Sequence, residues 1–299
     1  MINKMADETN QVQTQSRKSA FFKLACVLAF AYLFFLIILY SPLYQSIVLR
    51  PDYQPDLTYS PQPILGISPK ETSIISGQSK MHAWLFPVPK SKTLVLVHHG
   101  NAGNLLNRLF IAEACIQAGA SVLLYDYRGY GKSQGVAALE NLLADGLVAF
   151  DFVKNNYQYP VVINYGESIG SAVATYVDSQ RQANGLILQS GIASLPKVAR
   201  AGIVLLSLYP DFIWPPPLLD DQTLLSQSKT PLLLIHGERD TVVPINNSSL
   251  LNTSAKAADK SFIRLPDCGH NDVGLNDRNL YLEAISSFIH KINAGKTAN

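Results

Sequence analysis

The chain has 299 residues, 47% hydrophobic and 15% charged, a length that suits one domain of about 200–250 residues and a short extra segment. Its 24 Lys and Arg nearly balance 22 Asp and Glu, and residues 41–299 carry as many acidic as basic side chains, so charge gives no reason to expect a nucleic-acid partner. Cys26, Cys115 and Cys268 lack metal-ligand spacing, so we expect no structural metal site.

The N-terminal region combines a polar stretch with an apolar one. Residues 1–19 are mostly polar without apolar periodicity, and we expect a disordered tail there. Residues 20–44 contain an almost wholly apolar run of about 20 residues, long enough to cross a bilayer as a helix. We interpret this run as an uncleaved transmembrane signal anchor. A cleaved signal peptide is the alternative, although Ser41-Pro42-Leu43 makes a poor cleavage site.

The charges around this segment predict its orientation. Arg17, Lys18 and Lys23 lie on its N-terminal side, which favours a cytoplasmic N-terminus for this single-pass segment. We therefore expect the rest of the chain on the periplasmic or extracellular side, or in a lumen. Residues 45–65 contain several prolines and predict an extended tether to the following domain.

Residues 66–295 alternate β-type apolar runs with runs of helical period. We expect strands at 81–86, 93–98, 121–125, 161–165, 185–190, 231–235 and 261–265, and helices at 105–118, 137–153, 171–176 and 280–292. This alternation predicts an α/β fold with a mostly parallel, doubly wound sheet. A functional site in such a fold lies at the carboxyl ends of the strands.

A Gly-x-Ser-x-Gly motif, residues 166–170, lies between the expected strand 161–165 and the helix that follows. In that context the motif predicts a nucleophile elbow, a sharp turn that exposes the oxygen of Ser168 above the sheet. The two glycines allow the strand and the helix to pass closely. The pentapeptide alone is also consistent with a plain strand-to-helix turn.

Two further residues lie in loops that follow expected strands: His270 is a candidate base and Asp240 a candidate acid. Asp240 follows the strand 231–235, His270 follows the strand 261–265, and Ser-Asp-His is the order of such a triad in this kind of fold. The alternatives are a helix N-cap for Asp240 and a solvated loop histidine for His270. Glu238, Asp267 and Asp272 are rival acids, and we interpret His236 as structural because it comes too early in its loop.

An oxyanion hole requires two backbone N–H donors. One is expected from Ile169, the residue after the nucleophile, and the other from the glycine-rich loop that follows strand 93–98, where Asn101 is the best placed and Ala102 is the alternative. This loop also suggests a phosphate cradle, but it lacks the Gly-Lys-Ser/Thr ending of a P-loop.

These motifs resemble those of the α/β-hydrolase family, and more narrowly the membrane-anchored alpha/beta hydrolase domain-containing (ABHD) proteins with a His-Gly-Asn oxyanion loop. The matching segments are His99–Asn104, Tyr125–Ser133, Gly166–Gly170, His236–Asp240 with Val243-Pro244, and Gly269-His270. The resemblance implies Ser168 as nucleophile, His270 as base and Asp240 as acid, with Asn101 and Ile169 lining the oxyanion hole. It also implies that the Tyr127–Gly131 loop supports the structure without taking part in the chemistry.

The segment 191–230 is expected to form a short cap, which usually decides the substrate in this fold. We hypothesise that Tyr209 and Trp214 contribute to an apolar acyl-binding wall; the alternative is a buried helix and a turn. The sequence thus predicts a membrane-anchored serine hydrolase that cleaves carboxylic esters or thioesters of small or lipid-like acyl substrates without cofactor or metal. A serine peptidase or amidase on the same triad and a non-catalytic binding module are the alternatives.

Overall fold

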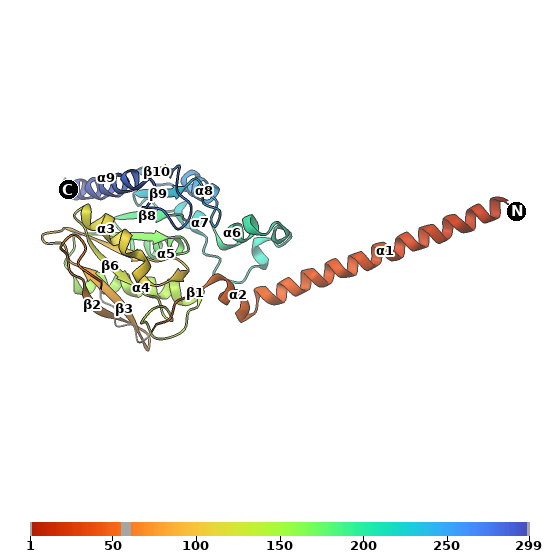
Figure 1. Cartoon of the computed structure of the whole chain (residues 1–299), viewed down its shortest axis with the longest axis horizontal. Helices are drawn as coiled ribbons and strands as arrows, with labels where there is room; N and C mark the ends of the chain where they lie inside the picture. The colour runs from red at the N-terminus through yellow and green to blue at the C-terminus, as the bar shows by residue number, and fades with distance from the viewer. Residues whose placement is uncertain (1, 55–60, 298–299) are drawn as a thin grey trace. The chain divides into compact units, whose positions relative to one another are not determined.

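The computed structural model describes residues 2–54 and 61–297, which fall into two compact units, Met1–Ile47 and Val48–Asn299. The first unit is helical and contains α1 (Ile2–Leu39) and most of α2 (Pro42–Val48) (Figure 1). Within α1, the 23 residues Arg17–Leu39 are long and apolar enough to cross a membrane. The helix begins well before this segment and includes residues 2–19, which we expected to form a disordered tail. Those residues contain no Gly or Pro to interrupt a helix.

Within the described residues of the second unit, eight strands form one sheet in the order β10-β9-β8-β7-β4-β6-β3-β2 (Figure 1). Strands β2 and β3 pair antiparallel with their neighbours, and the other neighbouring pairs are parallel. The strands are β2 (Lys70–Ser76), β3 (Ser79–Phe86), β4 (Thr93–His98), β6 (Ser121–Tyr125), β7 (Val161–Glu167), β8 (Gly185–Gln189), β9 (Leu232–Gly237) and β10 (Lys260–Leu265). The predicted mostly parallel α/β sheet is therefore confirmed.

Helices cover both faces of this sheet because its inner strands are apolar on both faces. Helices α3 and α9 pack on one face, and α4, α5 and α8 pack on the other. Their bounds are α3 (Leu109–Gln117), α4 (Leu139–Asn156), α5 (Gly170–Arg181), α8 (Asn246–Ser254) and α9 (Arg278–Thr297). The chain reverses its direction of winding between β4 and β7, so their carboxyl ends flank the switch point at which α/β proteins bind ligands.

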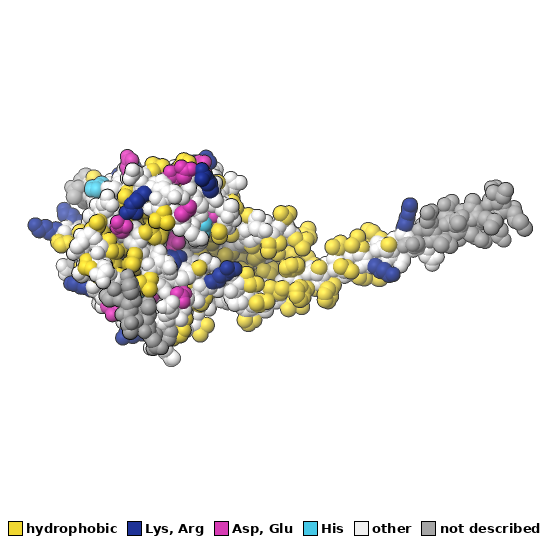
Figure 2. Space-filling view, in the orientation of Figure 1, with side chains coloured by type: hydrophobic (Ala, Val, Ile, Leu, Met, Phe, Trp, Pro, Cys, Tyr) yellow, Lys and Arg dark blue, Asp and Glu magenta, His cyan; other side chains and the backbone are white. Residues whose placement is uncertain are grey.

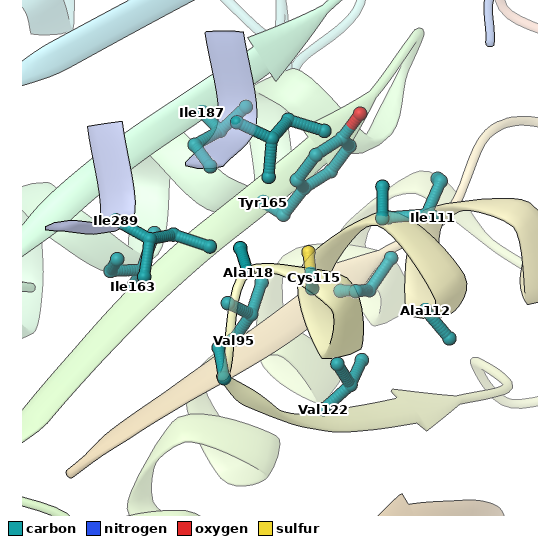
Figure 3. Close-up of a cluster of buried hydrophobic side chains, with 14 of the residues drawn as sticks. Val95, Ile111, Ala112, Cys115, Ala118, Val122, Ile163, Tyr165, Ile187 and Ile289 are labelled. Atoms are coloured by element: carbon teal, nitrogen blue, oxygen red, sulfur yellow. The ribbon is translucent and has the colours of Figure 1, made fainter. Parts of the chain in front are cut away.

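The core beneath α3 and α9 shows how the strand pattern produces the layers (Figure 3). Side chains alternate between the faces of a strand. Val95 and Ile187 therefore point into this core, whereas Leu186 and Leu188 enter the core on the opposite face. Cys115 of α3 is a free thiol buried among these side chains.

The cap between β8 and β9 is built from short helices: α6 (Leu195–Gly202), the 3-10 helices η2 (Val204–Leu208) and η3 (Asp211–Ile213), and α7 (Asp221–Leu225). It falls within residues 191–230, where we expected it.

The chain enters the second unit through a segment that is bonded to the domain, in contrast to the extended tether expected for residues 45–65. Strand β1 (Arg50–Pro51) pairs in parallel with β5 (Ala102–Gly103), and Tyr53 bridges to Gly131. The body therefore begins at Val48, before the residue 66 that we predicted. Residues 55–60 of the expected tether lie outside the described residues.

Candidate active site

Strand β7 ends in a strained turn that presents Ser168. The φ angle of Ser168 is 54°, in the left-handed region that non-glycine residues rarely adopt. The flanking glycines make the turn sterically feasible. A Cβ on Gly166 would lie 2.5 Å from Ser171 Cα, and a Cβ on Gly170 would lie 2.6 Å from His99 O. This strand–turn–helix geometry is that of a nucleophile elbow.

The loop after β10 brings an imidazole to this serine. His270 Nε2 lies 3.1 Å from Ser168 Oγ, within hydrogen-bond distance although the two residues are 102 positions apart. Ser168 is only 7% exposed. The side chains of Ser168 and His270 are therefore held together in a site that is largely closed to bulk water.

The loop after β9 brings a carboxylate to the far side of the imidazole. His270 Nδ1 lies 2.7 Å from Asp240 Oδ2, and the amides of Val242 and Val243 donate to Asp240 Oδ1 at 2.9 and 2.8 Å. His236 Nε2 lies 3.2 Å from Asp240 Oδ2. Burial raises the pKa of Asp240, but the hydrogen bonds from His236 and His270 outweigh it and hold the pKa below its ordinary value. Asp240 is therefore a carboxylate at neutral pH and orients His270 with Nδ1 protonated.

Gly237 allows the acid loop and the histidine loop to approach each other. A Cβ at Gly237 would overlap Cys268 O and would lie 2.6 Å from Gly269 O. The backbone of Arg239 also donates to Cys268 O at 2.9 Å. The relative position of Asp240 and His270 thus depends on a residue without a side chain at this crossing.

The loop after β4 lies beside the serine. A Cβ at Gly100 would be 3.4 Å from Ser168 Cβ. Within residues 2–54 and 61–297, the backbone N–H groups of Asn101 and Ile169 donate no hydrogen bond. The carbonyl of Asn101 is fixed by Arg50 N at 3.0 Å and by the Tyr130 hydroxyl at 3.0 Å. Among the described residues, the two amides expected to line an oxyanion hole therefore have no protein partner; Ile169 follows Ser168 directly, and Asn101 follows the Gly100 that lies beside it.

An ion pair that sequence reasoning missed joins this loop to the elbow. Arg108 Nε donates to Glu167 Oε2 at 2.6 Å, and the same oxygen accepts the Gly100 amide at 3.1 Å. Arg108 also donates to Ala102 O at 2.7 Å, and the side chains of Arg108 and Glu167 are 8% and 12% exposed. Arg108 lies in the 3-10 helix η1 (Leu105–Arg108), and the only signal was a charged residue in a helix start where the apolar Leu105 and Leu106 come first.

The segment Tyr127–Gly131 and the preceding Asp126 hold the loop after β4 in place. The Tyr127 hydroxyl donates to His99 O at 3.1 Å, and the Asp126 carboxylate accepts the Leu105 amide at 2.7 Å. Burial lowers the pKa of the adjacent His98 to about 3, so this imidazole is neutral at physiological pH.

Tyr209 and Trp214, the expected acyl-binding residues, form the interior of the cap. They are 1% and 4% exposed, and Trp214 Nε1 donates to Tyr209 O at 3.2 Å. The Arg200 guanidinium lies 5.8 Å from the centroid of the Trp214 ring. The apolar side chains that the cap exposes are others, including Val204 and Phe212.

Among the rival acids, Asp267 pairs with Arg239 on the surface, and Asp272 accepts the Gly269 amide at 2.5 Å. Glu238 pairs with Arg264. None of these carboxylates takes the position of Asp240 beside His270. In the part of the chain that the structure describes, no three His, Cys, Asp or Glu side chains are grouped to hold a metal ion.

The chain is similar in sequence to known proteins. Residues 89–215 match the family model described as serine aminopeptidase, S33. An uncharacterized protein of Mycobacterium tuberculosis is 35% identical over 214 residues, covering 70% of this chain and 75% of that protein. Protein bem46 of Schizosaccharomyces pombe is 32% identical over 213 residues, covering 67% of this chain and 68% of bem46. The chain belongs to the α/β-hydrolase family.

A solved structure extends the likeness to the fold of this α/β-hydrolase. An esterase of Pyrococcus furiosus superposes with a TM-score of 0.69, covering 82% of this chain and 98% of that one, at 19% identity. At that identity the likeness concerns the fold. Family membership and fold together make the chain a hydrolase, whereas its bond specificity and substrate have to be argued from its own residues.

Proposed function

We propose that this α/β-hydrolase is a membrane-anchored serine hydrolase that cleaves carboxylic ester or thioester bonds through an acyl-enzyme. The observation that carries the proposal is the hydrogen-bonded series Asp240–His270–Ser168, with distances of 2.7 and 3.1 Å, on a strained elbow. This is the arrangement that a serine needs to act as a nucleophile at neutral pH.

The proposed reaction assigns one role to each of these groups. His270 Nε2 takes the proton of Ser168 Oγ as that oxygen attacks the substrate carbonyl, and Asp240 stabilises the resulting imidazolium. The amides of Asn101 and Ile169 stabilise the oxyanion. His270 then protonates the leaving group and activates a water that hydrolyses the acyl-enzyme. Side chains and backbone amides supply all of this chemistry, so the proposed reaction uses no cofactor.

We propose that α1 is the membrane anchor. Its segment Arg17–Leu39 has the length and composition of a span, and exposed apolar side chains such as Phe30 and Ile37 suit contact with lipid. Arg17, Lys18 and Lys23 favour a cytoplasmic N-terminus, with the hydrolase domain on the periplasmic, extracellular or lumenal side. An enzyme held at a bilayer meets acyl lipids at high local concentration, which supports a lipid-like substrate.

The family model favours a second candidate, because its description is that of an aminopeptidase. An amidase or peptidase would use the same three side chains and differ in how it holds the leaving nitrogen. The cap of this chain is short and built from brief helices, which supports the ester or thioester candidate. A non-catalytic binding module is the third candidate, and it would have no use for a strained, hydrogen-bonded serine.

The test is a substrate panel on the full-length protein in detergent. It contains p-nitrophenyl esters and acyl thioesters of increasing chain length, with aminoacyl p-nitroanilides as the amide arm. We expect turnover of the esters or thioesters, and loss of that turnover in Ser168→Ala. Turnover of the anilides alone would identify an amidase. An absence of turnover in every arm would favour the binding module.

A further inference from the structure

The outer surface of the cap carries a concentration of exposed apolar side chains. Five large apolar residues are exposed within ten positions: Ile203, Val204, Leu205, Leu208 and Phe212. Val204 is 80% exposed and Phe212 is 86% exposed. Figure 2 shows hydrophobic side chains gathered over the region that Figure 1 marks with α6. We call residues 203–212 the cap patch.

The cap patch is a folded surface with an apolar outer side. Leu206 and Tyr209 point inward and are buried, while their neighbours in the sequence point outward. The single charged residue of the patch is Asp211, and Arg200 neutralises it at 2.5 Å. Contiguous apolar exposure of this kind in a folded domain marks a surface for a partner or a membrane.

The cap patch and the candidate active site both lie at the carboxyl ends of the parallel strands, which form one edge of the sheet. The cap begins after the carboxyl end of β8, and Ser168 follows the carboxyl end of the adjacent parallel strand β7. Asp240 and His270 likewise follow the carboxyl ends of β9 and β10.

The chain also enters the domain at this edge. Val48 O accepts the side-chain amide of Asn101 at 2.9 Å, and Arg50 N donates to Asn101 O at 3.0 Å. Only residues 40–47 separate this point from the end of α1 at Leu39. Even fully extended, eight residues reach about 28 Å. Connectivity therefore keeps the carboxyl edge of the sheet close to any membrane that α1 spans.

We propose that the cap patch docks on the bilayer spanned by α1, so that the site opens towards the membrane and takes an acyl lipid directly from it. This inference rests on the proposed function for the anchor and for the hydrolase. It assigns the bilayer as the partner of the patch because the short connection brings this edge of the domain to it. Val204, Leu208 and Phe212 are exposed to solvent. Contact with lipid transfers these side chains from water to an apolar environment, which is favourable.

The test is tryptophan quenching by brominated lipids in the full-length protein reconstituted into nanodiscs. Phe212→Trp reports on the patch and Phe30→Trp on the anchor, above the common background of the buried Trp84 and Trp214. Gln158→Trp is the matched control, because this exposed residue precedes the amino end of β7, at the opposite edge of the sheet. We expect the added fluorescence to be quenched at positions 212 and 30 and not at 158.

Quenching at position 30 with none at 212 would overturn the docking and leave the anchor intact. An absence of quenching at both positions would overturn the anchor and the docking together. If position 212 escapes quenching by brominated lipid, yet is shielded from iodide in the water phase only when a nanodisc holds two protein copies, a second copy is its partner, and the proposal is overturned.

A functional test uses the double variant Val204→Glu and Leu208→Glu, which places charge on the outer face and leaves Leu206 and Tyr209 in place. We expect hydrolysis of an ester lipid embedded in the nanodisc to fall about tenfold or more, because two apolar contacts with lipid are lost. Hydrolysis of a short, water-soluble ester should be unchanged. Equal rates for variant and wild type on the embedded lipid would contradict the docking. If the wild type hydrolyses neither substrate, the hydrolase proposal fails, while the quenching measurement still decides the docking.

Discussion

Arg108 and Glu167 form a nearly buried ion pair, 2.6 Å between Nε and Oε2, that joins the loop of Asn101 to the elbow of Ser168. Glu167 directly precedes the serine, and its carboxylate also accepts the amide of Gly100. The pair therefore fixes the distance between the nucleophile and the oxyanion loop.

Glu167→Gln should lower the free energy of unfolding by about 3 kcal/mol, because it leaves the Arg108 cation buried without its counter-ion. It should also lower kcat for an ester more than it changes KM, since the misplaced amides act in the transition state. The double variant Arg108→Met, Glu167→Gln should recover part of the stability. Urea unfolding of the wild type, the single variants Arg108→Met and Glu167→Gln, and the double variant gives the coupling energy, and losses that simply add would contradict the role of the pair.

Asp240→Asn should lower kcat about a thousandfold or more, because an amide no longer fixes the His270 tautomer or stabilises its cation. His236→Phe should cost roughly tenfold to a hundredfold, since it removes only one hydrogen-bonding group from Asp240 while His270 keeps its carboxylate. Steady-state kinetics on one p-nitrophenyl ester ranks the two variants. Equal losses would mean that His236 takes part in the reaction itself.

Gly237→Ala should separate the loops that carry Asp240 and His270, because the added methyl group would lie 2.6 Å from Gly269 O. We expect a loss of kcat with little change in the binding of a non-hydrolysable substrate analogue. The matched control is Gly202→Ala in the cap, where a Cβ meets no atom within 4 Å. Similar activity of the two variants would show that this crossing does not set the geometry of the site.

The buried Asp221 of α7 should make stability depend on pH. Burial raises the pKa of its carboxyl well above the ordinary value, although Ser171 Oγ donates to Oδ2 at 2.7 Å. The folded protein therefore binds this proton more tightly than the unfolded chain does. Its contribution is fully present below about pH 4, the unfolded pKa, and is lost as the pH rises towards the folded pKa.

Asp221→Asn stays uncharged, so its free energy of unfolding should rise relative to wild type as the pH increases above about 4 towards the raised folded pKa, by up to about 1.4 kcal/mol per pH unit. The control is Asp151→Asn, a half-exposed carboxylate paired with Arg181 on the surface. Urea unfolding at several pH values measures both variants. A stability difference for Asp221→Asn that does not change with pH would contradict a buried neutral acid.

The inner strands were predictable from sequence because residues covered on both faces form continuous apolar runs, as in Leu94–Val97 of β4. The edge strand β2 was missed because its first half, Lys70–Ser73, is polar and is exposed or half exposed. Strand β1 was missed because Pro51 suggests a linker, yet a strand of two residues at an edge tolerates proline.

The proposed site residues could be predicted because each follows an apolar strand, and the carboxyl ends of these strands lie at the same end of the sheet. Arg108 escaped notice because its partner Glu167 is 59 positions away, and pairing between distant residues leaves no local pattern. The sequence leaves open whether Tyr209 and Trp214 form an acyl-binding wall or a buried helix and turn, because aromatic composition does not reveal which side of a short helix faces inward. Both side chains are buried within the cap.

The most direct test of the central claim is labelling of the full-length protein with a fluorophosphonate probe, which reacts with an activated serine. Mass spectrometry of the labelled peptide should place the adduct on Ser168. Labelling should vanish in Ser168→Ala and fall steeply in His270→Ala, because the hydroxyl depends on the imidazole 3.1 Å away. A wild-type protein that stays unlabelled, or a Ser168→Ala variant that labels as well as wild type, would contradict the account.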